Sequence, residues 1–189
     1  NLKAVNDAAG GAPVVVDRKI IDLLLFCRDL CEGTGGQVNA ALGGVLALWH
    51  DAREAGISDP ASAALPDAAA LAEAARPTDF SSVIIDEAAS TVQITDPALR
   101  LDVGAIAKGY AVEQVCRAAP DGLLLSVGGN VRATGPKPGG ENWVVGIQAP
   151  DGESGAFLHT LYVRDVFFFN FWEYKVFYTV GGVRYHHII

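Results

Sequence analysis

Residues 99–119 read LRLDVGAIAKGYAVEQVCRAA and predict a strand that leads almost directly into a helix. Leu99–Val103 is the strand, and Gly104 follows it. The helix is predicted over Ala107–Ala119 and would place its apolar face on these residues: Ala107, Tyr110, Ala111, Val115 and Ala118. A strand–glycine–helix junction is therefore expected near the middle of the chain.

Helices are predicted before this junction. Asp17 has the side chain and position of an N-cap for a helix that runs to about Cys31, where a glycine-rich turn ends it. Residues 38–55 predict a second helix, with Gly56 as its stop. Residues 68–75 form a third, because alanine is the strongest helix former.

After Ser82 the sequence changes to short apolar segments separated by turns. Residues 83–85 and 91–94 flank one such turn and predict a hairpin. Further strands are predicted at 123–127, 131–134, 143–148 and from Phe157 onward. Since helices come first and strands dominate later, the expected fold class is α+β, with the first-half helices packed on a mixed or antiparallel sheet.

The composition excludes several classes of protein. The chain has 189 residues, a net charge of −8, 50% hydrophobic residues and 19% charged residues. This apolar content rules out a disordered segment, and the acidic balance argues against general binding to nucleic acid. No apolar run is long enough for a transmembrane helix. Three cysteines without a zinc-type spacing argue against a disulfide framework.

The junction also carries the clearest sign of chemistry. The free N–H groups and the dipole of a helix start favour an anion, Lys108 adds a positive charge, and Gly109 allows close approach. Asp102 could accept hydrogen bonds from a ribose or a heterocycle. Together these features suit a phosphate-bearing ligand. The plainer alternative is a structural turn with a capping aspartate and a surface lysine.

A second glycine turn, Ser126–Asn130, follows an apolar strand. Gly128 and Gly129 would let a ligand approach the backbone closely. A Gly-Gly-Asn turn is also ordinary between antiparallel strands, so this segment alone does not decide between the two interpretations.

Five segments, taken in order, resemble the ApbE-type flavin transferases (FAD:protein FMN transferases). The most specific is Asp102–Val112, which resembles the signature of that family. The other four resemble its upstream glycine segment with a Leu-Trp pair, its Gly-Gly-Asn turn, the following strand, and the start of its His-Ile-Ile-Asp-Pro motif: Gly35–Asn39 through Leu48-Trp49, Ser126–Asn130, Trp143–Pro150 and Tyr185–Ile189. The resemblance runs over nearly all of residues 6–189.

The resemblance implies an ApbE-like, T-fold-related architecture and a single domain over residues 1–189 that is incomplete at both ends. Enzymes of this family split FAD, transfer FMN through its phosphate to a Thr or Ser hydroxyl of a target protein, release AMP and require Mg²⁺. The expected ligands are thus FAD, as substrate, and Mg²⁺, and the expected partner is the target protein. No catalytic residue is assigned. The compartment stays open, because members of the family are exported, lipid-anchored or cytoplasmic.

The family's motifs also imply a set of FAD contacts and one metal ligand. Asp102 and Lys108 would contact FAD. The backbone carbonyl of Ala105 would bind Mg²⁺, with the remaining ligands expected beyond Ile189. The other implied FAD contacts are Trp49, His50, Asp51, Gly128, Gly129, Asn130, His187 and Ile189.

Two other functions are left open by the sequence. The first is a protein that binds FAD without catalysis, because the family's Thr-Ser-Gly turn is replaced by bulkier residues in Asn170–Tyr174 and its further metal ligands lie downstream. The second is a structural relic with no affinity for flavin.

Overall fold

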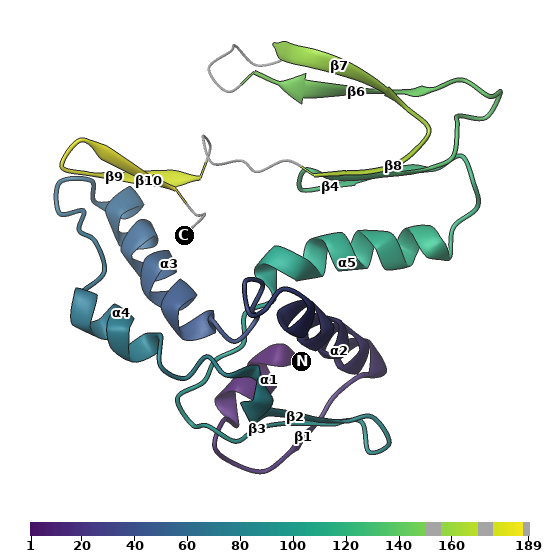
Figure 1. Ribbon diagram of the computed structural model, residues 1–189. Coiled ribbons are helices and arrows are strands. Elements are labelled where there is room, and N and C mark those ends of the chain that lie inside the picture. The colour runs from purple at the N-terminus through teal and green to yellow at the C-terminus, as the bar shows by residue number, and fades with distance from the viewer. Residues whose placement is uncertain (150–155, 170–175, 187–189) are drawn as a thin grey trace. The chain divides into compact units, whose positions relative to one another are not determined.

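The computed structural model describes residues 1–149, 156–169 and 176–186, which form helices and antiparallel strands (Figure 1). The chain divides into two compact units: unit 1 is Asn1–Gly104 with Phe177–Ile189, and unit 2 is Ala105–Val176. Helices dominate the first half and antiparallel strands the second, so the α+β fold class is confirmed. The single domain over residues 1–189 stays a prediction.

The helices of unit 1 are α1 (Leu2–Asp7), α2 (Arg18–Gly33), α3 (Gly43–Ser58) and α4 (Ala68–Ala74). Side chains cap the starts of α1, α2 and α4, whereas α3 begins after Leu42 without a side-chain cap. The predicted cap is confirmed, because the Asp17 carboxylate accepts a hydrogen bond from the Lys19 N–H at 2.9 Å. Asp67 caps α4 in the same way through the Ala70 N–H. A short 3₁₀ helix, η1 (Phe80–Ser82), leads into the strands.

The core of unit 1 lies between these helices and a small sheet. The sheet contains β1 (Val14–Val15), β2 (Val83–Asp86) and β3 (Thr91–Ile94), in the antiparallel order β1-β3-β2. The predicted hairpin is therefore confirmed. The largest fully buried side chains come from α1, α2, β3 and the segment after it: Val5, Ile21, Leu24, Cys27, Val92, Ile94 and Leu99. The buried face of α2 therefore consists of Ile21, Leu24 and Cys27.

The second helix departs from its predicted bounds. It begins at Gly43 and not at residue 38, and it runs through Gly56 to Ser58. Gly56 is buried, and a Cβ at this position would lie 2.7 Å from Cδ2 of Tyr178. Tyr178 belongs to β9 (Phe177–Val180), which pairs with β10 (Val183–His186) and contacts α3. Gly56 therefore allows a close ring contact and does not stop the helix.

The strand predicted at Leu99–Val103 is wrong, although the segment is extended. Leu99 and Leu101 are buried, as the alternation of apolar residues requires. The backbone of this segment pairs with a side chain and with a loop, because the Leu101 N–H donates to the Asn6 amide and the Asp102 N–H donates to the Ala40 carbonyl. Within the described residues, its β-pairing is limited to one isolated parallel bridge between Arg100 and Leu42.

Unit 2 places one helix beside a three-stranded sheet. The helix is α5 (Gly104–Arg117), which starts at the unit boundary. The sheet contains β4 (Leu124–Val127), β5 (Asn130–Thr134) and β8 (Asp165–Phe169), in the antiparallel order β4-β5-β8 (Figure 1). A second pair joins β6 (Trp143–Gln148) to β7 (Phe157–Val163). These strands lie where the sequence predicted them, to within a residue or two.

The apolar face predicted for α5 is wrong. The helix starts at Gly104, three residues before Ala107, and it buries Val112 and Cys116, whereas Val115 is 54% exposed. Gly109 lies on the packed side, because a Cβ there would meet Phe167 Cζ at 3.5 Å and Asn130 Oδ1 at 3.6 Å. Small alanines fit either side of a helix, so they did not mark the face that the sheet contacts.

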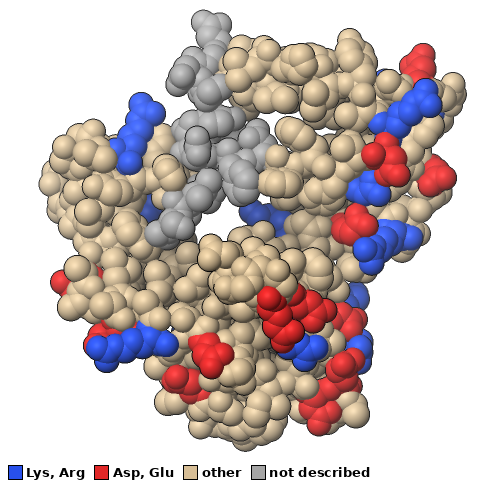
Figure 2. All heavy atoms as spheres, viewed as in Figure 1, with Lys and Arg blue, Asp and Glu red and all other residues tan. Residues whose placement is uncertain are grey.

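Charged side chains lie in groups on the surface of unit 1 (Figure 2). The α2 helix carries Asp22, Asp29 and Glu32, and Figure 2 shows acidic side chains gathered over this part of the molecule.

The packed side of α2 carries Cys27, and burial raises the pKa of its thiol to about 11. Among the described residues, no helix has the length and apolar character that a membrane span needs.

We expect Gly43→Ala to destabilise the protein by about 2 kcal/mol, because the added Cβ would lie 2.6 Å from the Arg100 carbonyl oxygen and 2.9 Å from the Leu101 carbonyl carbon. Both neighbours are backbone atoms that cannot rotate away. Urea unfolding measures the change. The matched control is Gly44→Ala, whose Cβ would make only ordinary contacts at 3.6 Å or more and should be neutral or stabilising in a helix. Equal stability of the two variants would contradict this account.

Candidate functional site

Asp102 ends the extended segment of unit 1 and caps the start of α5. Its Oδ1 accepts a hydrogen bond from the Gly104 N–H at 2.6 Å. The side chain is exposed, and the described residues supply no hydrogen-bond partner for Oδ2. The capping part of the structural interpretation is therefore confirmed. One carboxylate oxygen is still available to a ligand.

Lys108 lies in unit 2 beside the glycine turn. Gly128 and Gly129 join β4 to β5 with φ values of +54° and +88°, a two-residue turn that favours glycine at both positions. A Cβ on Gly128 would lie 3.8 Å from Lys108 Cδ, so the lysine stem passes over the turn. Asn130 closes the turn through its Nδ2, which donates to the Val127 carbonyl at 3.3 Å. The structure thus places Lys108 in contact with the Gly128–Gly129 turn, two features that the sequence analysis identified separately.

A shallow apolar groove runs along this face of α5. Its volume is about 280 Å³, and its lining is apolar apart from the lysine: Ala107, Lys108, Ala111, Val112, Val115, Leu125 and Val127. Among the described residues, Lys108 has no carboxylate within ion-pair distance. A single unpaired cation next to an apolar lining suits a ligand that joins an anionic group to an apolar body.

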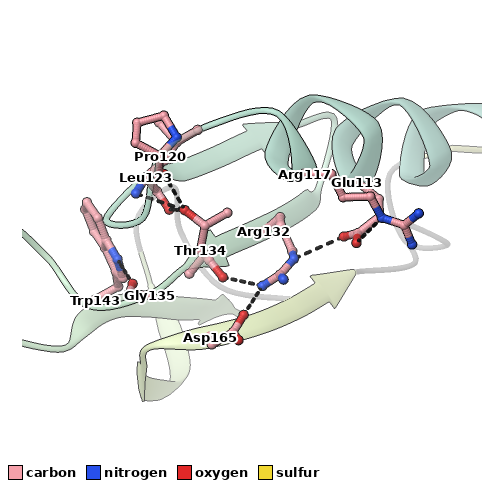
Figure 3. Close-up of polar contacts among 10 residues, drawn as sticks. Glu113, Arg117, Pro120, Leu123, Arg132, Thr134, Gly135, Trp143 and Asp165 are labelled. Atoms are coloured by element: carbon pink, nitrogen blue, oxygen red, sulfur yellow. Dashed lines mark hydrogen bonds and ion pairs between the residues drawn. The ribbon is translucent and has the colours of Figure 1, made fainter.

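An ion-pair network fixes the other end of α5. Arg132 on β5 lies between Glu113 on α5 and Asp165 on β8 (Figure 3). The Arg132–Glu113 distance is 3.1 Å, and Arg117 contacts the same carboxylate at 3.1 Å. The Arg132 side chain is 20% exposed, so this pairing is screened less than a surface pair. Arg132 is therefore engaged in holding α5 on the sheet, and sequence reasoning had not identified it.

Thr134, two residues after Arg132 on β5, carries a buried hydroxyl. Thr134 Oγ1 donates to the Pro120 carbonyl at 3.1 Å and accepts a bond from the Leu123 N–H at 3.2 Å (Figure 3). The Trp143 indole N–H donates to the Gly135 carbonyl at 2.9 Å. These bonds tie the loop after α5 and the start of β6 to the end of β5.

Trp49 lies on α3 in unit 1 and stacks on an aromatic side chain of β10. Its ring centroid is 6.4 Å from that of Tyr185, with an interplanar angle of 29°. Tyr185 in turn lies 5.9 Å from Tyr178 at 43°. This aromatic cluster was missed from the sequence, because Trp49 is more than 120 residues away from Tyr178 and Tyr185.

The two neighbours of Trp49 have plainer surroundings. His50 is exposed, and its Nδ1 lies 2.6 Å from an Arg53 guanidinium nitrogen on the next turn. Asp51 is exposed as well. The last two predicted FAD contacts, His187 and Ile189, lie outside the described residues, as does the Asn170–Tyr174 segment.

The metal prediction rests on one backbone group. Ala105 lies in the first turn of α5 and is exposed. In the described part of the chain, no three His, Cys, Asp or Glu side chains lie close enough together to hold a metal ion. A lone carbonyl does not provide the carboxylate oxygens that Mg²⁺ uses in proteins, so the described residues alone do not complete a Mg²⁺ site.

Comparison with known proteins gives a consistent result. The sequence model of the ApbE family matches residues 1–189. The chain is 37% identical over 205 residues to "FAD:protein FMN transferase" of Treponema pallidum (strain Nichols), covering 100% of this chain and 55% of that protein. It is 28% identical over 189 residues to a Klebsiella pneumoniae (strain 342) protein of the same name, covering 98% and 56%. The chain thus spans a little over half the length of these curated relatives.

Solved structures show the same fold. The crystal structure of the ApbE protein from Thermotoga maritima matches with a TM-score of 0.81 and 28% identity, covering 100% of this chain and 60% of that one. The apo form of the Pseudomonas stutzeri flavinyl transferase ApbE matches with a TM-score of 0.69 and 22% identity, covering 98% and 56%. At that identity the second match bears on the fold alone.

The Arg132 network should make stability depend on pH. Hydrogen bonds from Arg117 and then from Arg132 lower the pKa of Glu113 in the folded protein. Ionised Glu113 therefore stabilises the fold fully above the unfolded-state pKa of about 4.3, and this stabilisation is lost as pH falls through the lower folded-state pKa.

We expect Glu113→Gln to be less stable than the wild type near pH 7, and the deficit to be smaller near pH 3, in urea unfolding experiments. Glu141→Gln is the control, because Glu141 is exposed in the same unit and should change stability by less than about 0.5 kcal/mol. A deficit for Glu113→Gln that stayed constant between these pH values would show that charge is not its cause.

Proposed function

The chain belongs to the ApbE family, and from this premise we propose that the protein is an FAD:protein FMN transferase. It would move FMN from FAD, through the FMN phosphate, to a Thr or Ser hydroxyl of a target protein. The observation that carries the proposal is 37% identity, over the whole of this chain, to a Treponema pallidum protein of that name. The names of the relatives favour a transferase over a protein that only binds FAD.

The proposed reaction is a displacement at phosphorus. The hydroxyl oxygen of the target bonds to the phosphorus on the FMN side of the pyrophosphate, and the bond from that phosphorus to the bridging oxygen breaks. AMP leaves with the bridging oxygen, and the hydroxyl proton is released. Catalysis of such a step depends on positioning the reactants and on offsetting the negative charge of the phosphates.

Lys108 and the start of α5 would supply positive potential to the phosphates. The lysine has no acidic partner among the described residues, so its charge is not already neutralised. The glycine turn beneath its stem has no side chains at positions 128 and 129, which leaves space for a ligand. Asp102 would use its second carboxylate oxygen to accept hydrogen bonds from a sugar or a base of FAD.

The aromatic cluster of unit 1 would contact a ring of FAD. Trp49 offers an indole plane that Tyr185 already supports on one side, and ring stacking of this kind contributes about 0.5–1.5 kcal/mol beyond the buried area. We further propose His50, Asp51, Asn130, His187 and Ile189 as FAD contacts on the strength of the family motifs.

Dependence on Mg²⁺ is also a proposal. The ion would offset charge on the pyrophosphate, with the Ala105 carbonyl as one ligand. The described residues alone do not make a complete site for the ion.

The activity is tested with the full-length protein, FAD, Mg²⁺ and a target protein that contains an acceptor Thr. We expect a target labelled with flavin and an equal amount of AMP, both of which are lost with EDTA and restored by Mg²⁺. The measurements are in-gel flavin fluorescence and chromatography of the nucleotides. Stable binding of intact FAD without AMP would support the non-catalytic alternative, and no binding of FAD would reject both.

Lys108→Met should weaken FAD binding by roughly ten- to a hundredfold, the effect of losing a charged contact with the pyrophosphate. Methionine keeps a long stem over the Gly128 turn, so packing is preserved. Fluorescence titration with FAD measures the affinity. Lys19→Met is the control, since Lys19 is an exposed lysine on α2 of unit 1 and should leave the affinity unchanged. If Lys108→Met bound FAD as tightly as this control, Lys108 would be only a surface residue.

A further inference from the structure

We propose that Asn6 is a positioning residue for Asp102. Its side-chain amide hydrogen-bonds to the backbone N–H and C=O of Leu101. These bonds fix the position of the backbone next to Asp102, and therefore the position of the carboxylate that would contact FAD. This inference rests on the proposed function, because it concerns the affinity for FAD.

The contact joins two segments that are 95 positions apart in the sequence. Asn6 lies near the end of α1 and is half-buried. Its Nδ2 donates to the Leu101 carbonyl at 2.9 Å, and its Oδ1 accepts from the Leu101 N–H at 2.8 Å. A carboxamide carries an N–H donor and an oxygen acceptor side by side in one plane, so it can pair with both backbone groups of a residue as a neighbouring strand would.

The opposite edge of the same segment is also paired. The Asp102 N–H donates to the Ala40 carbonyl at 2.8 Å, and the Gly43 N–H donates to the Arg100 carbonyl at 3.0 Å. Leu101 itself is 4% exposed, so its polar groups would be costly to leave without partners. Asn6 thus replaces the strand that this edge lacks.

Asp102 depends on that placement because it is the next residue along the chain. Its Oδ1 bonds to the Gly104 N–H at 2.6 Å, which fixes one carboxylate oxygen. A shift of the Leu101 backbone would move the Asp102 Cα and change the position of the other oxygen, which is the one available to FAD. Loss of the Asn6 amide should therefore reduce affinity for FAD without removing any group that touches it.

The test measures FAD affinity and thermal stability of the full-length protein. Asn6→Leu removes both hydrogen bonds and keeps the branching of the side chain, and we expect it to weaken FAD binding about tenfold. Val5→Ala is the matched control: Val5 is the adjacent residue of α1 and 1% exposed, and its truncation destabilises the core but keeps the Asn6 amide. We expect it to lower the melting temperature at least as much as Asn6→Leu and to leave the affinity within about twofold.

A double-mutant cycle separates positioning from general stability. In an Asp102→Asn background, Asn6→Leu should change the affinity by less than about twofold, because the carboxylate that Asn6 positions is gone. A tenfold loss in both backgrounds would overturn the proposal, as would a wild-type affinity for Asn6→Leu. If Asn6→Leu does not fold, Asn6→Asp takes its place in the cycle, since it keeps the acceptor for the Leu101 N–H and loses the donor.

FAD binding by the wild-type protein distinguishes failure of the proposed function from failure of the Asn6 inference. A folded wild-type protein that does not bind FAD would reject the proposed function and this inference with it. A wild-type protein that binds FAD, beside an Asn6→Leu variant that binds equally well, would reject the inference alone.

Discussion

The structure depends most on an extended segment whose backbone is paired on both edges although it belongs to no sheet. Residues 99–102 are held by the Asn6 amide on one edge and by the loop before α3 on the other. The segment carries the buried side chains of Leu99 and Leu101 into the core of unit 1. It also delivers the chain to Gly104, where α5 begins. One short length of backbone therefore links the packing of the helices to the residue that caps the next helix.

The positive charge of Lys108 is opposite in sign to the net charge of the chain. The chain has a net charge of −8, which disfavours a polyanion such as FAD at long range. Arg132 cannot compensate, because Glu113 and Asp165 already neutralise it. Lys108 differs in having no acidic partner among the described residues, and it lies over a turn made of glycines. Of these two cations, Lys108, unpaired in the described part of the chain, is the one that we propose for a phosphate.

The sequence predicted well the features that depend on neighbours in the chain. The cap at Asp17 and the β2–β3 hairpin were correct, because capping and turn formation involve residues two to five positions apart. The predictions for Leu99–Val103, Gly56 and the face of α5 failed, since each is decided by a partner distant in sequence. The ring of Tyr178 explains Gly56, and the Asn6 amide explains why Leu99–Val103 is extended without being a strand. The same limit applies to the candidate site. Lys108 and the glycine turn were recognised as motifs, whereas their contact, the Tyr185 stack and the Arg132 network each join residues distant in sequence.

Each compact unit contains its own buried thiol, Cys27 in the first and Cys116 in the second. A thiol reacts with alkylating reagents as its thiolate, and burial raises the pKa of both groups, so in the closed structure both are protected. Reaction at either one therefore reports a transient opening of the unit that contains it. Because the two cysteines lie on different helices, mass spectrometry of the digested protein can time the two openings in one sample. The reaction rates of the two cysteines thus compare the local stability of the two units.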